Sequence, residues 1–157
     1  MKKIIILLIS LLLDGLIPNI TLYNINNLTY FTPMCTVICL IFLYNDKDFI
    51  KLYLQVSIIY GSLYMSNILL SFILFFCVMI SIKLMKKILE DNLFIIILEI
   101  LIVMTIFDGI YFLILSILTS NFIFNNYLYK FTHSLLLNLV YGLILYKITK
   151  KSSKFNY

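Results

Sequence analysis

Charged residues are scarce in this chain of 157 residues, and long apolar runs take their place. Asp, Glu, Lys and Arg together make up 12% of the sequence, against about 25% in soluble globular proteins. Hydrophobic residues account for 63%, and the mean hydropathy is +1.08. A soluble core of this size could not bury so much apolar surface. We therefore expect an integral membrane protein that forms a single domain over residues 1–157.

Residue types that carry common catalytic chemistry are also missing or few. The chain has no Arg to bind anions, only four glycines, and a single histidine, His133. It contains no HExxH, no CxxC and no Gly-rich phosphate loop. Cys35, Cys39 and Cys77 lie inside apolar runs, where a thiol packs as a small hydrophobic group. We therefore expect no enzymatic activity, no cofactor and no metal site.

The longest apolar run covers residues 93–118. At ~1.5 Å per residue it makes a helix of roughly 39 Å, longer than the ~30 Å hydrocarbon layer of a bilayer. Glu99 and Asp108 are its only charged residues. Their separation of nine residues places them on opposite faces of the helix, which excludes a close carboxylate pair. An acid at the bilayer centre costs about 2.5–3.5 kcal/mol, so both side chains should face protein or water.

Five further apolar runs are separated from this one by polar or charged segments. The shorter runs span the membrane only if lysines and tyrosines at their ends reach the interfaces. Between the runs we expect loops at residues 18–29 and 119–130 and a charged connector at 83–92. The predicted fold class is an all-α membrane protein with six transmembrane helices, over residues 4–17, 30–44, 49–64, 68–82, 93–118 and 131–148.

The lysines orient these six helices. With both termini in the cytoplasm, the single lysine on the outer side is Lys130, and eleven lie inside. This distribution follows the positive-inside rule. The lysines cluster at helix ends rather than on one face, so the net charge of +5 does not indicate nucleic-acid binding. The cytoplasmic lysines are residues 2, 3, 47, 51, 83, 86, 87, 147, 150, 151 and 154.

Four polar residues fall in the outer half of the bilayer in this topology. They are Asp14, Asp108, His133 and Asn138. One interpretation is a polar groove that receives a ligand or the helix of a partner, since intramembrane ionisable residues mark functional sites. The other is that these groups hydrogen-bond between helices and contribute only to packing, at ~0.6 kcal/mol each.

The order and spacing of several residues resemble the family of the rod shape-determining protein MreD. Phe31-x-Pro33 starts the second run, Gly61 lies late in the third, and Asp108 lies inside the fifth. The sixth run, HSLLLNLVYGLILYKI, carries Asn138 where the family tends to have Asn.

The chain departs from this family pattern after Gly61, where the Gly-containing turn that normally follows is shortened to Ser66-Asn67. The family usually has an acidic residue four positions after the glycine of the third helix, where this chain has Met65.

The resemblance implies a non-enzymatic scaffold of the bacterial cell-elongation machinery in the inner (plasma) membrane. Proteins of this family bind the single-span protein MreC. Through it they support MreB and the glycosyltransferase and transpeptidase that insert peptidoglycan along the side wall. A groove lined by Asp14 and Asp108 would suit such a partner.

A substrate-binding S component of an energy-coupling-factor vitamin transporter is the alternative, because it also has about six helices at this length. S components commonly dock their transport partner through small residues, often Ala at four-residue spacing, and this chain has no Ala.

Overall fold

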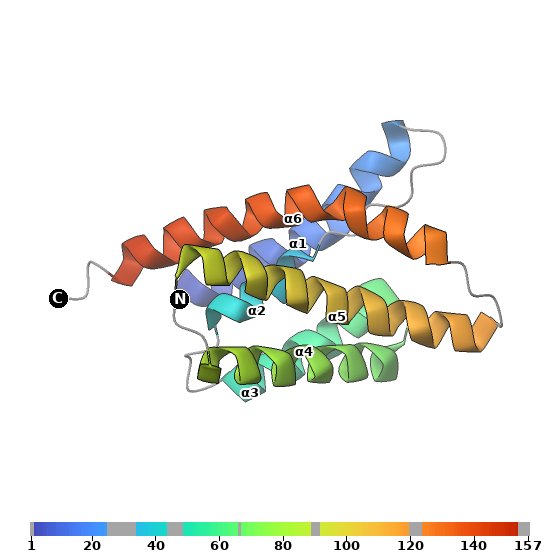
Figure 1. The fold of residues 1–157 in the computed structure, drawn as a ribbon, viewed down its shortest axis with the longest axis horizontal. Coiled ribbons are helices and arrows are strands. Elements are labelled where there is room, and N and C mark those ends of the chain that lie inside the picture. Colours follow the sequence, from blue (N-terminus) through green and yellow to red (C-terminus); the bar gives the residue numbers. More distant parts are fainter. Residues whose placement is uncertain are drawn as a thin grey trace.

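A computed structural model describes residues 2–24, 34–43, 49–65, 67–88, 92–119 and 124–153. Every element in these ranges is helical, which confirms the predicted all-α class for this part of the chain. The helices pack lengthwise as a bundle (Figure 1). In chain order they are α1 (Lys2–Asn24), α2 (Cys35–Leu43), α3 (Phe49–Tyr60), the π-helical segment η1 (Gly61–Met65), α4 (Ile68–Ile88), α5 (Leu93–Thr119) and α6 (Phe124–Ser153).

Three of these helices are long and apolar enough to cross a membrane. The spans are Ile68–Ile88 in α4, Leu93–Leu118 in α5 and Phe131–Lys150 in α6. Together α3 and η1 form a shorter apolar helix, Phe49–Met65. These features indicate a membrane protein, because exposed apolar faces on helices of this length have no suitable solvent other than lipid.

Several helices extend beyond their predicted limits. The first continues through Pro18 to Asn24, beyond the predicted end at residue 17. A proline removes one backbone hydrogen bond, and helices in membranes tolerate that loss where neighbouring groups compensate it. The charged connector begins as a continuation of α4 to Ile88, because Lys and Leu are good helix formers.

The last helix begins at Phe124 and ends at Ser153, so it includes part of the stretch that the sequence predicted as a loop. Asn costs well under 1 kcal/mol in a helix relative to Ala, and tertiary packing overrides so weak a preference. The second predicted run is shorter in the structure, with α2 confined to Cys35–Leu43. Residues 30–33 and 44 of that run lie outside the described residues.

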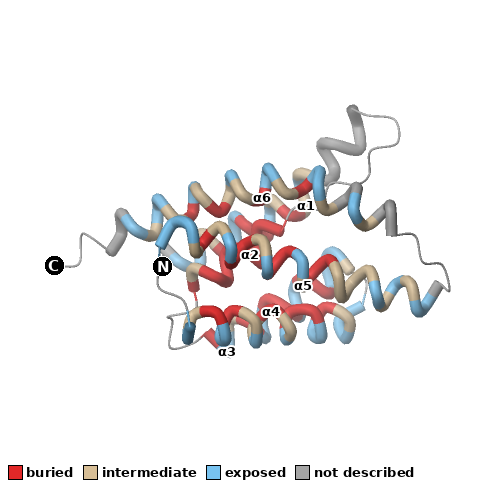
Figure 2. The backbone as a smooth tube through the Cα atoms, in the orientation of Figure 1, coloured by how far each residue is buried: buried red, intermediate tan, exposed pale blue. Residues whose placement is uncertain are grey.

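At the centre of the bundle lies α2, the shortest α-helix in the described part of the chain. Its sequence, CTVICLIFL, is apolar around its whole circumference, which is typical of a fully enclosed helix. Apart from Phe42, every residue of the helix is buried, and Figure 2 shows it as a nearly continuous buried segment. It packs against α1, α4, α5 and α6. At ~1.5 Å per residue it is roughly 14 Å long, about half the hydrocarbon thickness.

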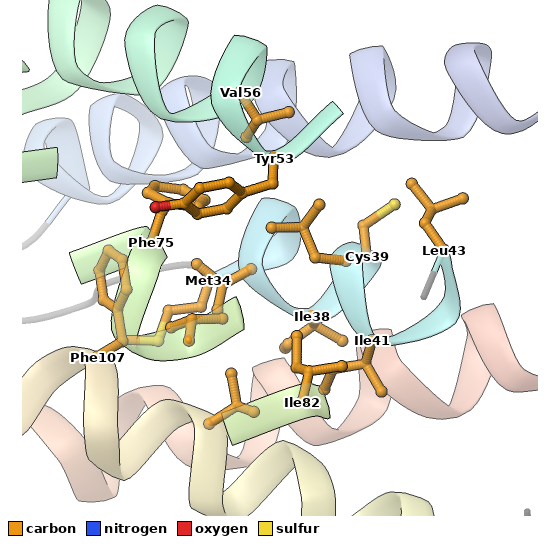
Figure 3. Packing of buried hydrophobic residues seen from close by; sticks show 14 of the residues in the cluster. Met34, Ile38, Cys39, Ile41, Leu43, Tyr53, Val56, Phe75, Ile82 and Phe107 are labelled. Carbon is orange, nitrogen blue, oxygen red and sulfur yellow. The ribbon is translucent and has the colours of Figure 1, made fainter. Parts of the chain in front are cut away.

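Aromatic side chains fill the space between α2, α4 and α5. Figure 3 shows Phe75 and Phe107 beside Met34 at the start of α2. The rings of Phe75 and Phe107 meet edge to face, with centroids 5.7 Å apart. Tyr60 adds a second edge-on contact to Phe75 at 5.2 Å. Such edge-on pairs contribute about 0.5–1.5 kcal/mol each beyond the area they bury, so they fix α3 on α4 and α5.

Two glycines permit close approach between helices. A Cβ atom at Gly61 would lie 2.8 Å from the backbone of Ile68, so α3 and α4 could not meet as tightly with any other residue there. A Cβ at Gly142 on α6 would overlap the side chain of Ile100 on α5. Small residues at such crossings are the usual means by which helices approach closely in membranes.

Candidate functional site

The polar cluster of the protein is built around the first turn of α2. A helix begins with four backbone N–H groups that have no partner within the helix. Here the first bond within the helix is donated by the Ile38 amide to the Met34 carbonyl, at 2.9 Å. The amides of Met34 and the next two residues are buried, so they need acceptors from elsewhere in the protein.

Asp14 on α1 supplies two of these acceptors. Its Oδ1 accepts a hydrogen bond from the Cys35 amide at 2.7 Å, and its Oδ2 accepts one from the Thr36 amide at 2.9 Å. The side chain is 4% exposed. A carboxylate is well suited to this place, because the N-terminal end of a helix carries a partial positive charge. Asp14 therefore caps α2 although it lies on another helix.

Asn138 on α6 supplies the third acceptor. Its Oδ1 accepts a hydrogen bond from the Met34 amide at 3.0 Å, and the side chain is 1% exposed. Two of the four predicted site residues therefore meet at one point. They bind backbone groups of the protein itself, and in doing so they tie α1 and α6 to the same end of α2.

Two further polar contacts hold α1 in place. The Ser10 hydroxyl donates to the Ile6 carbonyl at 2.7 Å and lies 2.6 Å from the Tyr141 hydroxyl on α6. The Tyr64 hydroxyl in η1 donates to the Leu11 carbonyl at 2.5 Å. Because α1 packs mainly on α2, these contacts connect it to α6 and to η1.

Sequence reasoning assigned no site role to these tyrosines, since interfacial and lipid-facing aromatics are common in membrane proteins. The sequence does indicate a polar face on α1, because the four-residue spacing of Ser10 and Asp14 places both on one side of the helix. The tyrosine partners come from distant parts of the chain, so no local pattern indicates them.

Asp108 is buried on α5 with 4% of its surface exposed. The hydrogen bonds to the first turn of α2 come from Asp14 and Asn138 rather than from this residue. The prediction that this acid turns away from lipid is confirmed.

His133, the fourth predicted residue, has an exposed side chain on α6. Five residues separate it from Asn138, which is about 140° around a helix. The structure therefore does not bring His133 to the cluster at α2.

Glu99 is the second acid inside α5, and it forms an ion pair. Its Oε2 lies 3.1 Å from Nζ of Lys86, near the end of α4. The carboxylate side chain is 2% exposed and the lysine side chain 12%. The prediction that Glu99 avoids lipid is confirmed, and the pair joins the end of α4 to the first turns of α5. It is far along α5 from Asp108, as the spacing of the two residues requires.

The arrangement offers hydrogen-bond acceptors to a helix end rather than ligands to a metal. Among the described residues, no group of three or more His, Cys, Asp or Glu side chains could hold a metal ion. The thiols of Cys35 and Cys39 are buried within α2, and Cys39 belongs to the apolar core.

Comparisons with protein-family models, with curated proteins and with solved structures find no match for this chain.

Proposed function

We propose that this chain is a non-enzymatic membrane scaffold of the MreD type, with MreC as its direct partner. The observation that best supports a scaffold is that buried polar side chains hydrogen-bond to the protein's own backbone. Asp14 and Asn138 are bonded to the backbone of α2. A binding protein for a polar vitamin would instead keep such acceptors available to its ligand. Polar side chains that fix the position of a central helix give a rigid framework.

The proposed topology has six membrane-crossing segments with both termini in the cytoplasm. In it, α2, roughly 14 Å long, crosses only as part of the longer predicted run at residues 30–44. The 23 residues of α1 extend roughly 34 Å at ~1.5 Å per residue, enough to cross. The start of α1, the end of α4, the start of α5 and the end of α6 lie at one end of the bundle (Figure 1). These are ends that carry lysines, so the shape of the bundle agrees with a cytoplasmic face at that end. The membrane is the bacterial plasma membrane in this proposal.

Through MreC, the scaffold would connect to MreB and to the glycosyltransferase and transpeptidase that extend the side wall. A partner with one transmembrane helix needs a protein surface to bind within the bilayer. A framework that turns Asp14, Asp108 and Asn138 inward can present a constant outer surface to that helix. This assignment rests on the sequence resemblance and on the inward use of polar groups described above.

Co-purification with MreC tests the proposal. The full-length chain and full-length MreC from the same genome are reconstituted together in nanodiscs, and each is purified through a tag on the other. The expected result is a stoichiometric complex. The matched control is an unrelated single-span membrane protein from that genome, which should not be retained.

Protection of the buried thiols of Cys35 and Cys39 shows that the chain is folded in this assay. A folded chain that retains no MreC would overturn the scaffold proposal. Stabilisation of that folded chain by a vitamin would then identify it as a transporter S component.

A further inference from the structure

One exposed face of α3 carries several polar residues. Lys51, Gln55, Ile58 and Ser62 recur at intervals of four, three and four residues, so they form one line along the helix and into η1. All four side chains are exposed. We call these four residues the outward line of α3. The opposite face is buried and consists of Phe49, Tyr53, Val56, Ser57 and Tyr60.

No other helix covers the outward line within the described part of the chain. The main neighbour of α3 is α4, apart from its own continuation into η1. It therefore lies at the edge of the bundle (Figure 1). The residues beside the line are apolar, with Leu54 and Ile59 among them. A polar line between apolar flanks differs from the uniformly apolar surface that lipid alone favours.

Gln55 is the residue of this line whose polar atoms are not accounted for. The Ser62 hydroxyl donates to the Ile59 carbonyl at 2.9 Å, within its own helix. By contrast, the Gln55 amide makes no hydrogen bond to any residue that the structure describes. It lies six residues from the start of α3, which is roughly 9 Å along the helix. In hydrocarbon an amide without a hydrogen bond is strongly unfavourable.

We infer that the outward line of α3 is the docking surface for the single transmembrane helix of the partner. This inference rests on the proposed scaffold function and names the surface that carries it. The partner helix crosses the same membrane and places a hydrogen-bonding side chain opposite Gln55. The apolar flanks of the line pack against the remainder of that helix. Polar pairs of this kind join helices within bilayers.

Charge favours a different protein over a second copy of this chain as the occupant. In a two-fold dimer centred on Gln55, the Lys51 side chains of both copies would come together one turn away. Like charges at that distance repel each other. A partner helix with an apolar or acidic residue at this level avoids the repulsion.

Photo-crosslinking in cells that express tagged MreC tests the docking surface. A benzoylphenylalanine is placed at Ile58 on the line, which is 51% exposed, or at Ile144 on α6, which is 50% exposed. The expected result is an adduct with MreC from position 58 and none from position 144. Equal adducts from both positions, or an adduct between two copies of this chain from position 58, overturn the inference.

Co-purification of MreC with Gln55→Leu provides the second measurement. The expected loss of affinity is between about 3-fold and about 18-fold, from the known range for interhelical hydrogen bonds in membranes. The thiols of Cys35 and Cys39 should stay protected, because the Gln55 side chain is exposed and makes no hydrogen bond to the described residues. Thr105→Leu on α5 is the matched control, since its exposed hydroxyl bonds only to its own helix.

Binding of MreC to the wild-type and Gln55→Leu chains tests the scaffold function and the docking surface separately. If MreC binds the wild-type chain and the Gln55→Leu chain equally, the docking surface is wrong and the scaffold function stands. If MreC binds neither chain although both are folded, both proposals fail.

Discussion

Removal of the cap on α2 should open the centre of the protein. Asp14→Leu leaves the amides of Cys35 and Thr36 without their acceptors, in a place that water does not reach. Each buried polar group that loses its partner costs about 1–3 kcal/mol, so the change should destabilise the packed state of α2 by about 2–6 kcal/mol. Loss of the carboxylate's interaction with the dipole of α2 adds to this destabilisation.

Thiol labelling measures this effect within α2 itself. Cys35 and Cys39 are 3% and 1% exposed, so a dye reaches them only when α2 opens. In a Cys77→Ser background they are the only thiols of the chain. At tenfold per 1.4 kcal/mol, a loss of about 2 kcal/mol speeds labelling roughly 30-fold, and larger losses speed it further.

Two variants calibrate the result. Asp14→Asn keeps one acceptor oxygen, so we expect about half the free-energy loss of the leucine variant. Thr105→Val removes an exposed hydroxyl that bonds only to its own helix, and it should change the opening free energy by less than about 0.5 kcal/mol. Equal labelling rates for Asp14→Leu and Thr105→Val would refute the role of Asp14 as the cap of α2.

Three further changes test the contacts around this centre. Tyr64→Phe removes the hydroxyl bonded to the Leu11 carbonyl and should lower the free energy of unfolding by about 1 kcal/mol, measured by titration with denaturing detergent. Gly61→Ala places a methyl group 2.8 Å from the backbone of α4. It should cost about 1–3 kcal/mol in the same titration, and a neutral effect would contradict the close crossing of α3 and α4. Glu99→Leu leaves Lys86 without the carboxylate at 3.1 Å. Because that lysine is 12% exposed, the loss should fall below the ~3–5 kcal/mol of a fully buried pair, and Lys86→Leu in addition should recover part of it.

The helices that could be predicted from the sequence are those that local patterns define. The run at residues 93–118 is bounded by a charged connector and an Asn-rich stretch, and the structure has α5 at Leu93–Thr119. The beginning of α6 could not be found in this way, because its first turns contain Asn, which is typical of loops. Composition separates apolar from polar segments well, but it does not show whether a polar segment continues a helix.

The candidate site could be predicted only in part, because its geometry depends on contacts between distant segments. The predicted topology placed Asp14 and Asn138 in the same half of the bilayer, and the structure brings them to the same helix end. The sequence could not show that their shared partner is the backbone of α2, since the Asn138 contact joins residues 104 apart in the chain. The contact of Tyr64 with α1 joins residues 53 apart.

The direction in which a polar side chain points separates the roles of these residues. Lipid offers polar groups no hydrogen bonds, so each one must find a partner in its own chain or in another protein. Acidic residues within apolar runs are the obvious candidates in the sequence for binding a partner. In the structure, however, Asp14 accepts hydrogen bonds from α2 and Glu99 pairs with Lys86. Both acids are therefore poorly available to a partner. Gln55 carries no charge and points outward. Its amide is therefore a better indication of where another helix binds than any buried carboxylate.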